Sequence, residues 1–88
     1  MARTFASPRH TALVNFLRKK REEKKGLTQA KVAKRLGRYQ SYVTDYERGQ
    51  KRIDAVELVN IAAAIGFDPI EAIQVIKRVK SRFANNSF

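Results

Sequence analysis

Four polar side chains of the kind that hydrogen-bond to base edges fall within one short run, QSYVTD, at residues 40–45. A glutamine can donate and accept together, which matches N6 and N7 of adenine. Serine and threonine hydroxyls can bond to bases or phosphates, and an aspartate can accept from N4 of cytosine. The candidate base-reading residues are therefore Gln40, Ser41, Thr44 and Asp45.

Cationic side chains flank this run on both sides and suit contact with a phosphate backbone. They are Arg38, Arg48, Lys51 and Arg52. Gln29 is a further phosphate candidate, because it opens a predicted helix whose free backbone N–H groups can hold an anion. Asp45 has an alternative role as an intramolecular partner of Arg48 or Arg38, since an unpaired carboxylate is repelled by DNA.

The charge balance points to the same class of partner. The chain has 88 residues, enough for one domain spanning 1–88, and its formal net charge is +11. Its pI is about 10.6, which makes nucleic acid the leading partner. Six basic residues and no acidic one lie between Lys24 and Thr44. Because 43% of the residues are apolar, we expect a folded core rather than a basic tail.

Composition argues against several other classes. The chain has no cysteine and a single histidine, His10, so it offers no set of residues for a metal site, a cofactor or catalysis. We therefore expect no enzyme and no small-molecule substrate. No apolar run approaches the ~20 residues of a membrane helix, and the N-terminus lacks a secretory pattern. We expect a soluble, cytoplasmic protein without a membrane partner.

Helix caps and apolar periodicity predict five helices. The first begins with Ser7 as N-cap and Pro8 at the first helical position, and it ends at Gly26. The second begins at Thr28, another N-cap, and stops at Gly37. Since no segment alternates apolar and polar residues as a half-buried strand does, we expect a compact all-α domain.

The third helix is predicted over about residues 40–48 and is closed by Gly49 in a left-handed conformation. The fourth opens with a capping box formed by Asp54 and Glu57 and ends at Gly66. Its body, AVELVNIAAAI, is apolar on most sides, so we expect it to be the central core helix.

Only about three residues, Gly-Arg-Tyr, separate the second and third helices, which predicts the sharp crossing of a helix-turn-helix over about 28–48. At about 100° per residue, the third helix places Tyr39, Val43 and Tyr46 on one side, with Tyr42 at its edge. We expect this side to pack on the core; a stacking platform for single strands is the less favoured alternative. The polar side is slim enough to enter a major groove about 12 Å wide.

The fifth helix repeats the capping signal with Asp68, Pro69 and Glu71, and we expect it to run on through Val79 and as far as Phe83. Its apolar side continues beyond what a monomer core needs, so residues 68–88 are a candidate dimer surface. The alternative is that the same residues only cap the core. The candidate surface consists of Ile70, Ile73, Ile76, Val79 and Phe83.

The run LTQAKVAKRLGRYQSYVTDYERGQKRIDAVELVNIAAAIGFDP resembles the Cro/C1-type (XRE-family) helix-turn-helix domain of phage repressors and bacterial regulators. The resemblance covers about residues 27–73 and the basic first helix. It is carried by Thr28, Gln29, Ala33, Leu36, Gly37, the Glu47–Gly49 turn, and Ala63, Ile65 and Gly66 before Asp68.

This resemblance implies a lambda-repressor-like bundle of five helices that binds operator DNA as a symmetric dimer. It implies that Gln29 clamps a phosphate and that the four candidates of the third helix occupy the base-reading positions. It also implies that Glu47, which lies at the border of the buried face, pairs with an arginine of the first helix, for which Arg21 is the candidate.

The chain departs from the family pattern at three places. The connection at residues 24–26 is one residue longer than usual, and Lys31 stands where the family often has an acidic residue that completes a capping box. Asp45 stands where a neutral or basic residue is usual, so the base preference of relatives does not transfer to this chain.

From these features we expect a sequence-specific regulator of transcription that binds double-stranded DNA, a repressor on a palindromic operator, acting as a homodimer. The alternative is an antitoxin-type interaction module, which binds a toxin protein and represses its own operon. An RNA-binding role is less favoured, because the sequence has neither an RNP-type aromatic strand nor a GXXG loop.

Overall fold

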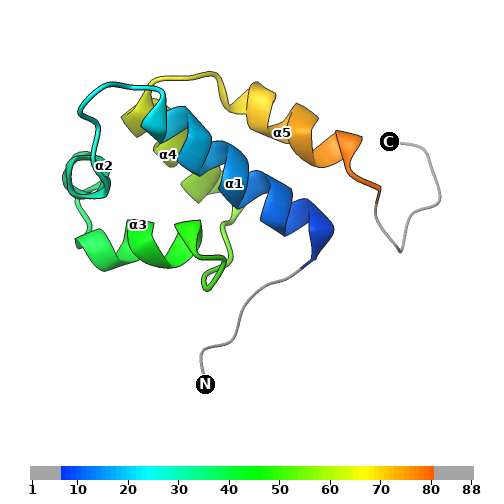
Figure 1. The fold of residues 1–88 in the computed structure, drawn as a ribbon, viewed down its shortest axis with the longest axis horizontal. Coiled ribbons are helices and arrows are strands. Elements are labelled where there is room, and N and C mark those ends of the chain that lie inside the picture. Colours follow the sequence, from blue (N-terminus) through cyan, green and yellow to red (C-terminus); the bar gives the residue numbers. More distant parts are fainter. Residues whose placement is uncertain (1–6, 81–88) are drawn as a thin grey trace.

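The computed structural model describes residues 7–80, which form five α-helices and contain no β-strand. The helices are α1 (Pro8–Glu22), α2 (Gln29–Leu36), α3 (Gln40–Glu47), α4 (Ala55–Ile65) and α5 (Pro69–Arg78). Figure 1 shows α1 and α5 side by side, with α2 seen end-on and α3 on the other side of α1. The predicted all-α class with five helices is confirmed.

Side-chain caps begin most of the helices where the sequence predicts them. Ser7 and Thr28 accept hydrogen bonds from the third backbone N–H of α1 and α2. Asp54 and Glu57 form the predicted capping box at the start of α4. Thr28 caps α2 by itself, because Lys31 cannot return the second hydrogen bond of a capping box. These polar contacts fix the starting points of the helices.

One of the predicted glycine ends differs from the structure. Gly37 and Gly66 close α2 and α4 in left-handed conformations, as predicted. The prediction that Gly26 closes α1 is wrong, because α1 ends at Glu22 and Gly26 lies in the connection to α2. There the chain leaves the helix through a turn in which the N–H of Lys24 donates to the carbonyl of Arg21 at 3.1 Å.

The fifth helix is shorter than predicted. It ends at Arg78, and Val79 is extended, with its carbonyl accepting from Nε of Arg9 at 2.7 Å. The expected continuation through Val79 is therefore wrong, and Phe83 lies outside the described residues. Asp68 caps the backbone N–H of Ile70 at the start of the helix.

The core lies between the five helices. Its buried apolar side chains are Leu13, Leu17, Leu27, Val32, Ala33, Val43, Tyr46, Leu58, Ile61, Ile65 and Ala72. As expected of a core helix, α4 contributes Leu58, Ile61, Ala62 and Ile65 to the core, but its other apolar side chains Val56 and Val59 are 70% and 53% exposed. One face of α4 packs inward, and the opposite face carries apolar side chains into solvent.

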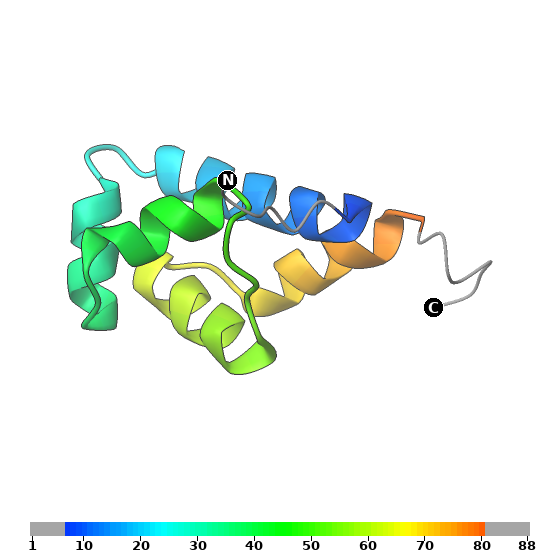
Figure 2. The ribbon, with the colours of Figure 1, turned by 90° about the horizontal axis from the view of Figure 1, so that it is seen from below.

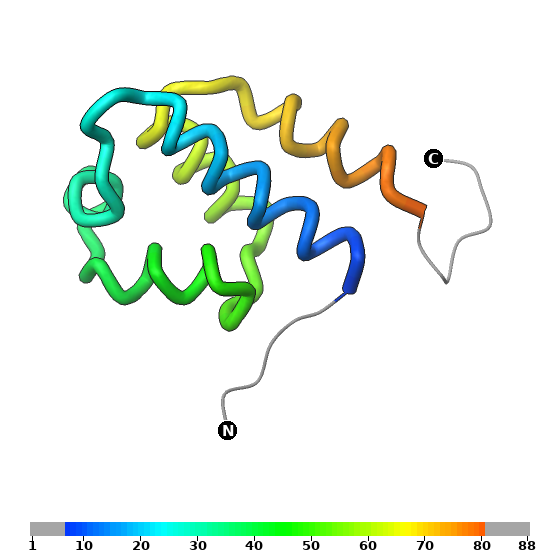
Figure 3. The backbone as a smooth tube through the Cα atoms, in the orientation of Figure 1, coloured from blue at the N-terminus to red at the C-terminus, as the bar shows by residue number. Residues whose placement is uncertain are grey.

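The short connection between α2 and α3 makes the two helices cross sharply, as Figure 2 and Figure 3 show. Three residues, 37–39, join them, and Arg38 donates its backbone N–H to the carbonyl of Ala33 at 2.9 Å. The predicted helix-turn-helix is present at residues 28–48. Within residues 7–80, no helix is long and apolar enough to cross a membrane.

Candidate nucleic-acid interface

The polar side of α3 faces away from the core. Val43 and Tyr46 are fully buried beneath it, whereas Gln40 and Ser41 are exposed. Thr44 and Asp45 are half-buried and lie along the same polar side. The four residues that the sequence singles out for base contact therefore lie together on one accessible strip.

The position of Tyr39 differs from the prediction. The helical wheel places it with Val43 and Tyr46 against the core, but its side chain is 88% exposed. Tyr39 is the N-cap of α3 and has extended backbone angles, φ −71° and ψ 154°. Because it lies outside the helical spiral, the wheel that places the rest of α3 does not apply to it.

A buried carboxylate joins α3 to α1. Nε of Arg21 donates to Oε2 of Glu47 at 2.7 Å, and Nη2 of Arg21 donates to Oε1 at 3.1 Å. Only 8% of Glu47 is exposed, and two parallel bonds of this kind hold a guanidinium and a carboxylate in one geometry. The ion pair implied by the family resemblance is thus present in the structure.

Gln29 extends this ion pair to the reading strip. Its Nε2 donates to Oε1 of Glu47 at 2.8 Å, and its Oε1 accepts from the hydroxyl of Thr44 at 2.7 Å. The amide of Gln40 also approaches Oε1 of Gln29, at 3.5 Å. We call Arg21, Glu47, Gln29, Thr44 and Gln40 the Glu47 network. Because the proton of Thr44 points inward, its oxygen lone pairs remain available outward as acceptors.

The carboxylate of Asp45 has no partner in the described part of the chain. No ion pair joins it to Arg48 or to Arg38, the alternative partners that the sequence suggests. Arg48 is exposed and likewise forms no ion pair within residues 7–80. A carboxylate acceptor and an unpaired guanidinium therefore stand near the C-terminal end of α3.

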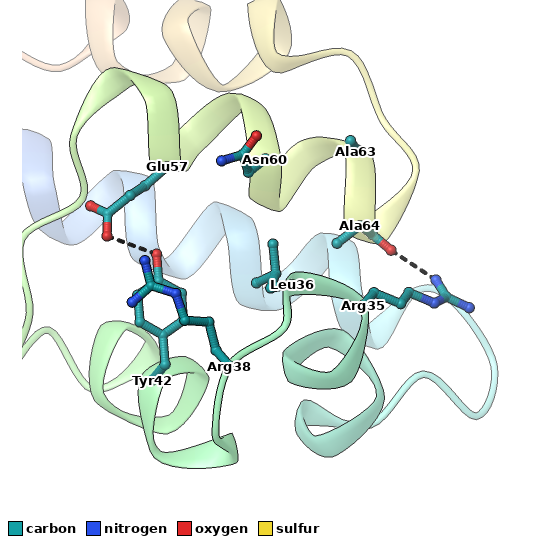
Figure 4. A pocket seen from close by; sticks show the side chains of 8 residues that line it. All are labelled: Arg35, Leu36, Arg38, Tyr42, Glu57, Asn60, Ala63 and Ala64. Atoms are coloured by element: carbon teal, nitrogen blue, oxygen red, sulfur yellow. Dashed lines mark hydrogen bonds between the residues drawn. The ribbon is translucent and has the colours of Figure 1, made fainter.

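A second polar cluster holds the other side of α3, and we call it the Glu57 cluster. The hydroxyl of Tyr42 donates to Oε2 of Glu57 at 2.9 Å, and Nζ of Lys51 lies 3.4 Å from the same oxygen. The guanidinium of Arg38 lies 4.6 Å from the centre of the Tyr42 ring. Figure 4 shows Tyr42 and Arg38 beside Glu57, in a hollow between the helix-turn-helix and α4.

Hydrogen bonding and burial move two pKa values in this cluster. The backbone N–H of Asp54 is the largest cause that lowers the pKa of Glu57, with Tyr42 and Lys51 adding to it. Burial raises the pKa of Tyr42, and its bond to Glu57 raises it further.

Lys51 and Arg38, both predicted to hold phosphates, contact Glu57 and the Tyr42 ring and are engaged within the protein. Arg52 is exposed on the α3–α4 connection.

A hollow of about 280 Å³ adjoins the Glu47 network and carries further cations. Arg18 and Arg48 line it together with Gln29. Arg18 is not named individually by the sequence analysis, because the polar stretch at residues 18–25 is typical of a solvated face and phosphate contact is its less favoured alternative. Its position one helical turn before Arg21, the residue paired with Glu47, is the signal that could have identified it.

Apolar side chains are exposed on α4 and α5. Ile70 and Ile73 are 57% and 41% exposed, whereas Ile76 is half-buried and packs against the core. Val79 is half-buried beyond the end of α5. Val56 and Val59 of α4 are exposed as well. Among the described residues, no group of three or more His, Asp or Glu side chains could hold a metal ion.

The sequence and the fold are similar to those of known proteins. A family model described as Helix-turn-helix matches residues 17–71. The chain is 39% identical over 59 residues to the uncharacterized HTH-type transcriptional regulator y4dJ of Sinorhizobium fredii, a match that covers 67% of this chain and 74% of the relative.

Solved structures give the same picture. An XRE-family like protein from Pseudomonas syringae pv. tomato is 34% identical with a TM-score of 0.73, covering 80% of this chain and 84% of that chain. The restriction-modification controller protein C.AhdI from Aeromonas hydrophila is 33% identical with a TM-score of 0.65, covering 72% of this chain and 94% of that chain.

Proposed function

The chain belongs to the XRE type of the helix-turn-helix family of transcriptional regulators, and we propose that it represses transcription by binding a palindromic operator as a dimer. Its family role is DNA binding and regulation rather than catalysis. The observation that supports sequence-specific binding is the Glu47 network, in which Gln29 holds the side chains of Thr44 and Gln40 on the accessible strip of α3.

We assign base reading to the polar strip of α3, inserted into the major groove. The outward groups of Thr44 and Asp45 are acceptors, because the proton of Thr44 is bound to Gln29 and Asp45 is a carboxylate. Acceptors match the amino groups of cytosine N4 and adenine N6. We therefore expect the operator half-site to present cytosine or adenine amino groups opposite the middle of α3.

We assign the main backbone contacts to Arg18 and Arg48. Both are exposed and line one hollow with Gln29, next to the N-terminus of α2, where free N–H groups favour an anion. Arg18 pairs with Glu22 at 3.3 Å, but an exposed pair of this kind contributes little stability, so Arg18 can exchange it for a phosphate. Arg38 and Lys51 can reach a phosphate only by leaving the Glu57 cluster. Gln29, with one N–H bound to Glu47, has a second N–H available for the phosphate contact implied by the family.

We propose that α5 and α4 form the dimer surface together. The exposed side chains Ile70 and Ile73 support this assignment, and Val56 and Val59 widen it beyond the fifth helix. A two-fold dimer would place two α3 helices about 34 Å apart, one helical turn of DNA. Sedimentation should show that the unchanged chain binds DNA as a dimer and that Ile73→Asp is a monomer. If the unchanged chain binds DNA as a monomer, the dimer proposal is rejected.

Selection from random duplexes at stated salt tests the reading assignment. We expect a palindromic consensus, and we expect Gln40→Ala to weaken binding to it by about 1–3 kcal/mol and to relax the choice at one base pair. Arg48→Ala is the matched control, because removing a phosphate partner weakens all sequences together and flattens the salt dependence. Unchanged affinity and unchanged base preference in Gln40→Ala would show that α3 is not the reader.

The antitoxin alternative keeps the same DNA-binding face and adds a protein partner. It differs from a simple repressor in one measurable respect, because a toxin protein would remain bound when the operator complex is purified. Recovery of a stoichiometric second protein with the operator complex would favour the antitoxin role.

A further inference from the structure

A second basic hollow is lined by residues of the α1–α2 connection, of α2 and of the end of α4. It has a volume of about 330 Å³ and its floor contains Leu27 and Ile65. Four cationic side chains line it and no acidic side chain does: Lys24, Lys25, Lys31 and Arg35. None of these cations forms an ion pair within residues 7–80, so their charge is not neutralised inside the protein.

Two of the cations are held in place by the end of α4. Nζ of Lys24 donates to the carbonyl of Gly66 at 3.3 Å, and Nη1 of Arg35 donates to the carbonyl of Ala64 at 2.7 Å. These carbonyls carry the partial negative charge of a helix C-terminus. They orient Lys24 and Arg35 without cancelling a full charge, and Lys25 and Lys31 remain exposed beside them.

The first turn of α2 contributes to both hollows, because Lys31 lines this one and Gln29 lines the hollow of the proposed DNA-binding face. Leu27 lines the second basic hollow, and two residues later Gln29 lines the hollow that contains Arg18 and Arg48. The N-terminus of α2 thus lies between two basic hollows. In Figure 1, α2 and the α1–α2 connection lie at the opposite end of the molecule from the last turns of α5. In a dimer built on the α4–α5 face, this hollow would point outward along the DNA.

We propose that this hollow binds the phosphate backbone of the same duplex outside the segment read by α3, so that the bound site is longer than the consensus. This inference rests on the proposed function. DNA is favoured over an acidic protein because the first turn of α2, which is assigned to the duplex through Gln29, also carries Lys31 of this hollow. Cations spaced around a hollow can also follow the regularly placed phosphates of one strand.

The test compares two charge-neutralised variants on two duplexes. The probe variant is Lys25→Gln/Lys31→Gln, and the control Lys19→Gln/Lys80→Gln removes the same two charges from exposed positions outside both hollows. The short duplex contains only the selected consensus, and the long duplex adds about ten base pairs at each end. Circular dichroism and thermal unfolding establish that both variants fold like the unchanged chain.

We expect the probe variant to bind the long duplex more weakly than the control does, on the order of ten-fold, and to bind the short duplex like the control. Its salt slope on the long duplex should flatten by about 0.9 for each phosphate that the variant no longer neutralises. Equal binding of the two variants on the long duplex, or an equal extra loss on both duplexes, would overturn the proposal. Failure of the unchanged chain to prefer the consensus over scrambled DNA would instead overturn the proposed function.

Discussion

Glu47 and Glu57 hold α3 from opposite sides, and the two carboxylates differ in how they are solvated and bound. Glu47 has a side chain only 4% exposed, and it receives two bonds from Arg21 and one from Gln29. Glu57 is 17% exposed, and it binds a phenol, an ammonium and the backbone N–H of Asp54. We infer that Glu47 fixes the reading strip, whereas Glu57 anchors the helix to α4.

The largest effect on stability should come from removing the buried carboxylate of Glu47. Glu47→Ala removes the buried carboxylate from the guanidinium of Arg21, which is 13% exposed and keeps only the carbonyl of Leu27 at 3.1 Å and Glu22 at 3.9 Å; this should lower the free energy of unfolding by about 3 kcal/mol. Urea unfolding measures the loss. Glu47→Gln keeps the shape and some of the hydrogen bonds, so its loss should be smaller. A change below about 1 kcal/mol in Glu47→Ala would mean that the network does not hold α3.

A smaller effect is expected on the other side of α3. Tyr42→Phe removes the hydroxyl that donates to Glu57 and keeps the ring beneath Arg38, so the unfolding free energy should fall by about 1 kcal/mol. Tyr46→Phe is the matched control, because the buried hydroxyl of Tyr46 has no hydrogen-bond partner among the described residues. Its removal should be neutral or stabilising. If both variants lose the same unfolding free energy, the hydrogen bond from Tyr42 to Glu57 does not account for the loss.

The smallest effect should appear in the pH dependence of stability. The pKa of Glu57 is lowered from 4.5 in the folded chain, so its ionised form is favoured by folding. Its contribution is therefore present above about pH 4.5 and is lost as the pH falls through the lower folded value. The thermal stability measured between about pH 5 and 3 should fall less steeply in Glu57→Gln than in the unchanged chain. Parallel curves would assign the acid loss to other carboxylates.

Features set by neighbouring residues could be predicted from the sequence. A cap depends on a side chain and an N–H three residues away, so Thr28, Asp54 and the glycine ends of α2 and α4 were predictable. The end of α1 was not, because Gly26 marks a turn that begins before it. Tyr39 was assigned to the core because a helical wheel gives no information about a residue just outside the helix.

The partners of the polar residues were harder to predict, because they depend on how the helices pack. Gln29 was predicted to hold a phosphate, but the sequence contains no signal for its bond to Thr44 across 15 positions. The engagement of Lys51 by Glu57 likewise requires α4 to lie beside the α3–α4 connection. Because the body of α4 is apolar on most sides, its sequence does not say which face another helix covers, and the exposure of Val56 and Val59 is not predictable from it.

One shared oxygen has a consequence for redesigning or evolving this protein. Oε1 of Gln29 is the acceptor for both Thr44 and Gln40, so neither reading side chain is set independently of the other. The base preference therefore cannot be changed one position at a time, because a substitution at residue 44 also alters the hydrogen bonds that residue 40 can offer to a base. A library that varies positions 29, 40 and 44 jointly should yield new target preferences that single-site libraries miss.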